Sequence, residues 1–133
     1  MVTQDIVNAV LIADGQVLLA RRSAHRKAYA NCWSFPGGHV QAGESRGNAL
    51  VRELREELGV IPLASGKLGK IAEPEPETNG NVIYHFYAVT AWTGEPRLIG
   101  DEHSEMRWFD VDAACALSGL ALPEYEAVLR KVG

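Results

Sequence analysis

The sequence predicts an α/β fold in which a mixed β-sheet is covered by helices on both faces, an α/β/α sandwich. Strand-like segments occur both before and after one strongly amphipathic helix in the middle of the chain. Further helical segments follow near the C-terminus. A helix that is apolar on one side must bury that side, and a sheet offers a surface for this.

Six segments have the β-branched, aromatic and other apolar residues that are typical of strands. They are residues 6–13, 16–20, 33–35, 63–71, 81–90 and 106–109. The first two are joined by Asp14-Gly15, a pair that favours a tight hairpin turn. In the fifth segment, alternation places Tyr84 and Phe86 on one face and Tyr87 on the other.

Loops are predicted where turn-forming or charged residues gather. Residues 23–32 are polar without a clear period, residues 73–80 contain two prolines and an Asn-Gly pair, and residues 100–105 are acidic. Near the C-terminus, residues 113–117 are predicted to form a short helix. Residues 124–131 are predicted to form a longer helix that a proline opens.

The central helix is predicted from its ends and its apolar face. Ser45 is a favourable N-cap, Glu44 lies beside the positive end of the helix dipole, and Gly59 is placed to end the helix. At about 100° per residue, four apolar side chains fall on one side of this helix. They are Leu50, Val51, Leu54 and Leu58.

Three glutamates project together from the edge of this apolar stripe. Glu53, Glu56 and Glu57 are spaced i, i+3, i+4, and each like-charged pair destabilises a bare helix by about 0.2–0.5 kcal/mol. Arg52 or a bound cation can offset this repulsion. Three carboxylates on one rigid face suit Mg²⁺, which takes oxygen ligands and keeps waters for a phosphate substrate. The alternative is a solvated, charge-rich helix face.

The glycine-rich segment before this helix extends the glutamate spacing into a longer motif with residues at fixed positions. The chain reads Gly, five residues, Glu, seven residues, Arg-Glu-aliphatic-any-Glu-Glu-any-Gly-aliphatic. Its fixed positions are Gly38, Glu44, Arg52, Glu53, Glu56, Glu57 and Gly59. This pattern resembles the signature of the Nudix (MutT-type) hydrolase family without a departure. The resemblance implies the Nudix fold over a single domain, residues 1–133, although only residues 37–60 match a sharp motif.

Nudix enzymes hydrolyse a nucleoside diphosphate linked to another group, so the resemblance implies Mg²⁺ as cofactor, with Mn²⁺ as a substitute. Divalent ions neutralise the diphosphate and lower the pKa of the attacking water. The implied metal ligands are Glu53, Glu56, Glu57 and a carbonyl of Gly37 or Gly38. Arg52 is expected to fix the orientation of a glutamate. Glu44 is expected to hold the loop against the helix, and Gly59 to end the helix.

A further carboxylate often comes from a later loop in this family. Glu102, six residues before Trp108, is the residue expected to act in catalysis and metal binding. Glu105, Asp101 and a plain solvated loop are the alternatives. The general base is Glu53 or Glu102, depending on which carboxylate reaches the nucleophilic water.

Three residues are expected to contact substrate. Arg22 ends the second strand, where an arginine contacts substrate in related proteins. Trp33 and Tyr84 lie on later strands, and a core position is the alternative for Trp33. Two interpretations are left open for Arg26 and Lys27 in the loop after Arg22. They contact phosphate, or they belong to a solvated basic loop.

The expected substrate is a nucleoside triphosphate, oxidised or not, cleaved to nucleoside monophosphate and pyrophosphate. The compact chain favours this assignment, whereas Pro74 and Pro76 lie where ADP-ribose enzymes carry a proline. An ADP-ribose or nucleotide-sugar pyrophosphatase is therefore the alternative. Tyr125 lies where an asparagine would read oxidised guanine, which weakens that narrower assignment. A non-catalytic nucleotide sensor is a third hypothesis, disfavoured because the signature glutamates are all present.

Composition limits the partners. A net charge of −4 argues against a nucleic-acid polymer but not against a small nucleotide diphosphate derivative, because a metal ion can reverse the local field. Cys32 and Cys115 are far apart and are expected to be reduced thiols in a cytoplasmic protein. No signal peptide and no membrane span are expected. Monomer and homodimer are both left open.

Overall fold

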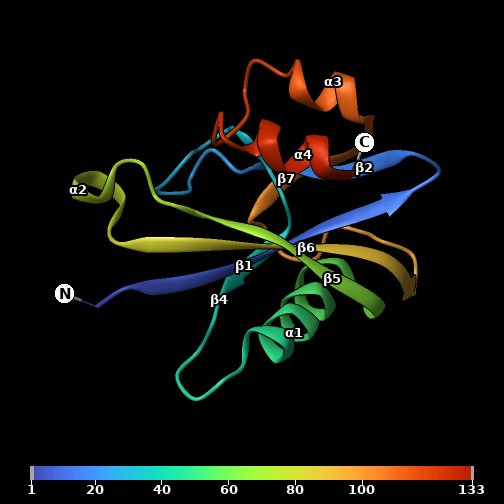
Figure 1. Ribbon diagram of the computed structural model, residues 1–133, viewed down its shortest axis with the longest axis horizontal. Coiled ribbons are helices and arrows are strands. Elements are labelled where there is room, and N and C mark those ends of the chain that lie inside the picture. Colours follow the sequence, from blue (N-terminus) through green and yellow to red (C-terminus); the bar gives the residue numbers. More distant parts are fainter. Residues whose placement is uncertain (1, 133) are drawn as a thin grey trace.

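The computed structural model describes residues 2–132 and has the layered arrangement that the sequence predicts (Figure 1). The strands are β1 (Gln4–Ala13), β2 (Gln16–Arg22), β3 (Trp33–Ser34), β4 (Gly37–His39), β5 (Ile61–Ala72), β6 (Val82–Thr93) and β7 (His103–Asp110). The helices are α1 (Arg46–Leu58), α2 (Pro76–Asn79), α3 (Val111–Cys115) and α4 (Tyr125–Val132). In Figure 1, α1 lies on one side of the sheet and α3 and α4 lie on the other, which confirms the predicted α/β/α sandwich.

The described strands form one mixed sheet around β1, in the order β3-β2-β1-β6-β5. β1 pairs in parallel with β6 along residues 4–11, and the other pairings are antiparallel. On its second edge, β1 pairs first with β4 through residues 6–8 and then with β2 through residues 12–13. β7 pairs with β2. This change of partner along β1 brings the glycine-rich β4 into the sheet.

Strand alternation divides the core into two layers. The layer against α4 includes Val10, Leu19, Phe35, Phe86, Tyr125 and Leu129. The layer against α1 includes Val7, Leu11, Leu18, Leu50, Leu54, Leu58 and Val89. The predicted faces of β6 are confirmed, because Tyr84 and Phe86 pack in the first layer and Tyr87 packs in the second. Val51, predicted on the apolar stripe of α1, is instead 38% exposed.

Both predicted ends of α1 are confirmed. The Ser45 hydroxyl accepts a 3.1 Å hydrogen bond from the Asn48 N–H, which satisfies a free donor of the first turn. Gly59 has a φ of 69° and its N–H donates to the Arg55 carbonyl, so it closes the helix in the left-handed region. Neither α1 nor any other helix within residues 2–132 is long and apolar enough to cross a membrane.

Three segments differ from the prediction, and strand pairing explains two of them. β4 was not among the predicted strands, and a Cβ at Gly37 would overlap the Val7 carbonyl, so only glycine allows its pairing with β1. β7 begins inside the predicted acidic loop because Arg22 pairs with His103. α2 is a short helix inside the predicted loop of residues 73–80.

Candidate active site

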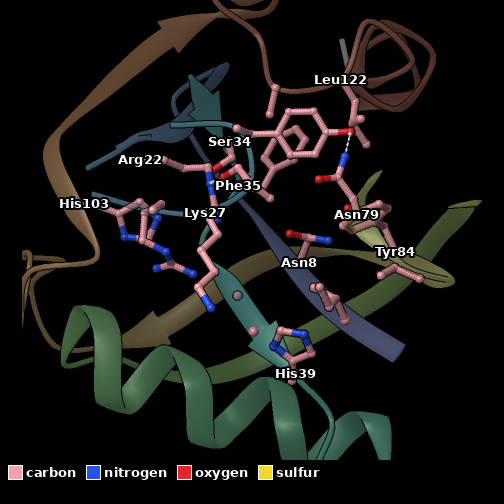
Figure 2. A pocket seen from close by; sticks show the side chains of 18 of the residues that line it. Asn8, Arg22, Lys27, Ser34, Phe35, His39, Asn79, Tyr84, His103 and Leu122 are labelled. Atoms are coloured by element: carbon pink, nitrogen blue, oxygen red, sulfur yellow. Dashed lines mark hydrogen bonds between the residues drawn. The ribbon is translucent and has the colours of Figure 1, made fainter. Parts of the chain in front are cut away.

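A cavity of about 330 Å³ lies at the end of the sheet where β4 enters (Figure 2). One side carries basic and polar groups, and Figure 2 shows Arg22, Lys27 and His103 there. Asn79 and Tyr84 lie on the opposite side of the same view. Apolar and aromatic residues of the lining include Phe35, Tyr84, Ala121, Leu122 and Tyr125. Gly37, Gly38, His39 and Glu57 supply its wall beside α1.

Glu57 is the signature glutamate that reaches this cavity. It is 6% exposed and accepts a 3.0 Å hydrogen bond from the Gly37 N–H. Burial, a hydrogen bond with Glu102 and the charge of Glu102 raise the pKa of Glu57 to about 10. The glycine strand β4 therefore holds a carboxyl group of α1 at the edge of the cavity.

The loop before β7 brings Glu102 to the same place. The Glu102 carboxylate accepts a hydrogen bond from Glu57, and this contact lowers the pKa of Glu102. Arg26 lies 3.6 Å from Glu102, and the Glu102 carbonyl accepts a 3.0 Å bond from the Ser23 N–H. The alternative carboxylates point elsewhere: Asp101 lies 3.9 Å from His25, with a side chain 91% exposed, and Glu105 pairs with Arg21 and Arg107.

Arg52 joins the two ends of the signature. Its guanidinium donates two hydrogen bonds to Glu44, of 2.7 and 2.9 Å, and one of 2.9 Å to the His39 carbonyl. It also donates to Glu53 at 2.8 Å and to Glu56 at 3.3 Å. Arg52 and the Gln41 N–H lower the pKa of Glu44 to about 2. Glu44 therefore contacts both the loop before α1, through Gln41, and α1 itself, through Arg52.

Glu53 is held between Arg52 and β4. A Cβ at Gly38 would overlap the Glu53 carboxyl group, so glycine lets the main chain lie against this carboxylate. Burial raises the pKa of Glu53, and the charges of Glu56 and Glu102 raise it further. Glu56 is the most open of the three, with a side chain 56% exposed.

The carboxyl groups of these residues have the chemistry that a divalent cation requires of its ligands. Within residues 2–132 no three His, Cys, Asp or Glu side chains are already gathered to hold a metal ion. Glu102 nevertheless raises the pKa of both Glu53 and Glu57, so the three carboxyl groups repel one another when charged. A hard cation among oxygen donors offsets such repulsion. The main chain of Gly37 and Gly38 lies beside Glu57 and Glu53.

Of the three residues expected to contact substrate, Arg22 and Tyr84 line the cavity and Trp33 does not. Arg22 lines the cavity and donates a 2.8 Å hydrogen bond to the Ala28 carbonyl. Burial and then Arg26 lower the pKa of Arg22. Tyr84 lines the cavity, but its hydroxyl donates to Glu73 at 2.7 Å.

Trp33 is not among the residues that line the cavity. Its ring makes an edge-on contact with Phe109 at 5.2 Å between centroids, and the Arg107 guanidinium lies 5.7 Å from the ring centre. The core alternative for Trp33 therefore matches its position.

Asn8 lines the cavity and has no role in the sequence predictions, and Tyr29 makes a contact there that they do not include. Asn8 is a polar residue in an otherwise apolar strand, and this mismatch was a usable signal. Tyr29 lines the cavity, and its hydroxyl binds Glu73, 44 residues away along the chain. No sequence pattern relates two residues at that separation.

Comparison with known proteins places the chain in a family. The NUDIX domain model matches residues 2–132. A crystal structure of MutT NUDIX hydrolase from Burkholderia pseudomallei superposes with a TM-score of 0.88 and 28% identity over 100% of both chains. The fold is thus that of a Nudix protein, and the chain belongs to the Nudix hydrolase family. This confirms the family and the class of protein predicted from the sequence.

The curated relatives carry different substrate names. The chain is 37% identical to CTP pyrophosphohydrolase of Escherichia coli (strain K12) over 112 residues, covering 83% of this chain and 78% of that protein. It is 35% identical to 8-oxo-dGTP diphosphatase of Haemophilus influenzae over 99 residues, covering 74% and 69%. It is 32% identical to ADP-ribose pyrophosphatase of Methanocaldococcus jannaschii over 106 residues, covering 80% of this chain but 61% of that protein.

Proposed function

We propose that this protein is a Mg²⁺-dependent pyrophosphohydrolase that cleaves a nucleoside triphosphate to nucleoside monophosphate and pyrophosphate. The observation that carries this proposal is that one cavity has both a charged wall and an aromatic lining. Glu57, beside Gly37, lies at a wall with basic groups nearby, and Phe35 and Tyr125 supply aromatic lining. A nucleoside triphosphate has the matching division between charged phosphates and a flat base. Relatives named for CTP and 8-oxo-dGTP support the same class.

The acidic groups would hold the metal. Glu53, Glu56, Glu57 and Glu102 offer carboxylate oxygens, and Gly37 or Gly38 offers a carbonyl. When bound, Mg²⁺ supplies charge neutralisation of the diphosphate and a lower pKa for the attacking water, and Mn²⁺ would serve as a substitute. The side chains of Glu53 and Glu57 are fixed before binding, by Arg52 and by the Gly37 N–H. Such fixed ligands reduce the reorganisation that binding requires.

The chain's own residues would then position the reaction. Arg22, Arg26 and Lys27 line the cavity and can pair with phosphate oxygens. Water attacks one of the two phosphorus atoms joined by the α–β anhydride, a new O–P bond forms, and the anhydride P–O bond breaks to give nucleoside monophosphate and pyrophosphate. The proton of the water passes to a carboxylate, Glu53 or Glu102. Both candidates are held by hydrogen bonds, to Arg52 and Glu57 respectively.

An ADP-ribose or nucleotide-sugar pyrophosphatase is the second candidate. Pro74 follows Glu73, Pro76 begins α2, and Asn79 at the end of α2 lines the cavity. The 32% identity with an ADP-ribose pyrophosphatase also favours this candidate. A non-catalytic nucleotide sensor is the candidate of another class, and turnover alone separates it from both enzymes.

A substrate panel at fixed Mg²⁺, with products resolved by chromatography, tests the proposal. We expect nucleoside monophosphate and pyrophosphate in equal amounts from one or more nucleoside triphosphates. Omission of metal and the variant Glu57→Gln should both abolish turnover, whereas Arg55→Lys on the exposed side of α1 should not. Release of AMP and ribose 5-phosphate from ADP-ribose alone would replace the first candidate by the second. Nucleotide binding without turnover would favour the sensor.

A further inference from the structure

Asn8 of β1 has a buried amide group with an unused donor. The residue is 5% exposed, and its Nδ2 atom has no hydrogen-bond partner within the described residues. Alternation along β1 explains the position, because Val10 on the same face packs in the apolar layer against α4. A polar side chain on such a face lowers the stability of the fold unless some partner accepts its hydrogen bond.

The amide of Asn8 points into the cavity. Figure 2 shows it in the centre of the view, between Phe35 and His39 and facing the space beside Tyr84. Asn8 pairs with Gly37 of β4, the residue whose N–H holds Glu57. Neighbouring strands lie about 5 Å apart, so Asn8 lies roughly one strand spacing beyond the wall that carries the carboxylates. A group bound there would lie beside the glycine strand that holds Glu57.

Three polar side chains near Asn8 in the cavity lining, Tyr29, Tyr84 and Asn79, are already engaged. The hydroxyls of Tyr29 and Tyr84 both donate to the Glu73 carboxylate. Glu73 also accepts from the Glu75 N–H, and Asn79 donates to the Tyr29 hydroxyl at 3.4 Å. The Asn8 Nδ2 therefore offers a donor that the neighbouring side chains do not consume.

We infer that Asn8 is a specificity-determining residue that donates a hydrogen bond from Nδ2 to an acceptor atom, a keto oxygen or a ring nitrogen, on the nucleobase of the substrate. This inference rests on the proposed function, because it assigns the base of the same nucleotide to this side of the cavity. The aromatic lining from Phe35 and Tyr125 suits a flat ring, and Asn8 selects among rings by the acceptor that they present. A site built to bond one polar atom discriminates strongly against analogues that lack it.

Two substitutions separate hydrogen bonding from shape. Asn8→Leu keeps the branching of the side chain and removes the donor, whereas Asn8→Ala removes the donor and leaves space. Affinities are measured without metal, by calorimetry, for the four common nucleoside 5′-monophosphates, IMP and ribose 5-phosphate, which has no base. Thermal unfolding of each variant is measured in the absence of nucleotide.

We expect the wild type to bind its preferred monophosphate more tightly than ribose 5-phosphate. Both variants should lose about tenfold in affinity for that monophosphate, reducing the spread among bases, with ribose 5-phosphate unaffected. Asn8→Leu should also melt at a higher temperature than the wild type, because it removes an unpaired buried donor. A role for Asn8 in the fold alone predicts the opposite change in melting temperature and no change in base preference.

The inference is overturned if both variants keep the wild-type base preference, as they would if Asn8 held only an ordered water. It is also overturned if only Asn8→Leu loses affinity, which would indicate a steric block. Equal losses for ribose 5-phosphate would assign Asn8 to the sugar or phosphate instead. Failure of the proposed function looks different, since the wild type would then bind nucleotides with base preference but hydrolyse none of them in Mg²⁺.

Discussion

Tyr84 on β6 donates a 2.7 Å hydrogen bond to Glu73, which directly follows β5. Tyr29, from the loop after β2, donates to the same carboxylate at 2.8 and 2.9 Å. Glu73 is 5% exposed, so a buried charge ties the polar loop to the sheet at the border of the cavity. Burial opposes the charge of Glu73, but the hydrogen bonds outweigh it and lower the pKa of this carboxyl.

Glu73→Gln should therefore destabilise the fold by roughly 2 kcal/mol at neutral pH, through the loss of charge-assisted hydrogen bonds. Because the folded-state pKa is depressed, this contribution is complete above the unfolded-state value of 4.5 and is lost as pH falls through the lower folded-state pKa. Denaturant unfolding of both proteins at pH 7 and at pH 3 measures it. The difference between them should shrink at the lower pH, and a constant difference would contradict the assignment.

Arg52→Lys should lower kcat/KM by about tenfold or more while the protein stays folded. A lysine has one charged nitrogen and cannot keep the paired contact with Glu44 together with those to Glu53 and His39. Steady-state kinetics and metal titration check this prediction. Arg55→Lys makes the same change three residues later on an exposed site and should be silent.

Glu57→Gln should abolish turnover without unfolding the protein, because glutamine has the same shape and can still accept from the Gly37 N–H. It should also change the response to metal. Saturating Mg²⁺ should raise the melting temperature of the wild type, by mass action equivalent to about 2.7 kcal/mol at a hundredfold excess over Kd. The variant should show a smaller rise after chelator treatment, and an equal rise would exclude Glu57 as a ligand.

Glu102→Gln should lower kcat strongly with little effect on nucleotide affinity, as expected for a group whose interaction strengthens in the transition state. Glu105→Gln is the matched control, because Glu105 pairs with Arg21 and Arg107 instead of Glu57. Single-turnover rates and nucleotide titrations separate the two effects. If Glu102→Gln keeps the wild-type rate, Glu53 becomes the better candidate for the general base.

Gly37→Ala should prevent β4 from pairing, because the added Cβ would overlap the Val7 carbonyl. We expect a destabilisation of several kcal/mol or failure to fold, which expression level and circular dichroism would show. Gly47→Ala provides the control, since a Cβ there meets nothing within 4 Å. That change lies in α1 and should stabilise the protein by about 0.5 kcal/mol. Two alanines with equal effects would contradict this account of β4.

Local patterns predicted the features that depend on neighbouring residues. The caps of α1 and the glutamate spacing follow from residues within about one helix length of each other, so both were available from sequence. The family resemblance predicted a carboxylate from a later loop, and Glu102 was selected within that loop by its position before Trp108. The structure places Glu102 in contact with Glu57. Its role in catalysis stays a prediction.

Contacts between distant segments could not be predicted in this way. Trp33 has a side chain that could stack on a nucleobase. The pairing of β3 with β2 instead directs its ring to Phe109 and away from the cavity. The pairing of β4 with β1 depends on how Gly37 meets Val7, 30 residues away. An aromatic or glycine residue looks the same in sequence whichever partner it meets.

Two separate groups of hydrogen bonds hold the opposite sides of the cavity. Arg52 joins Glu44 and Glu53 beside α1, while Glu73 joins Tyr29 and Tyr84 on the far side of the cavity. No hydrogen bond recorded within residues 2–132 links one of these groups to the other. Mutations in the second group therefore leave the hydrogen bonds of the first group in place. In a lineage of such proteins, the side of the cavity held by Glu73 can diverge while the contacts of Arg52 beside α1 are retained.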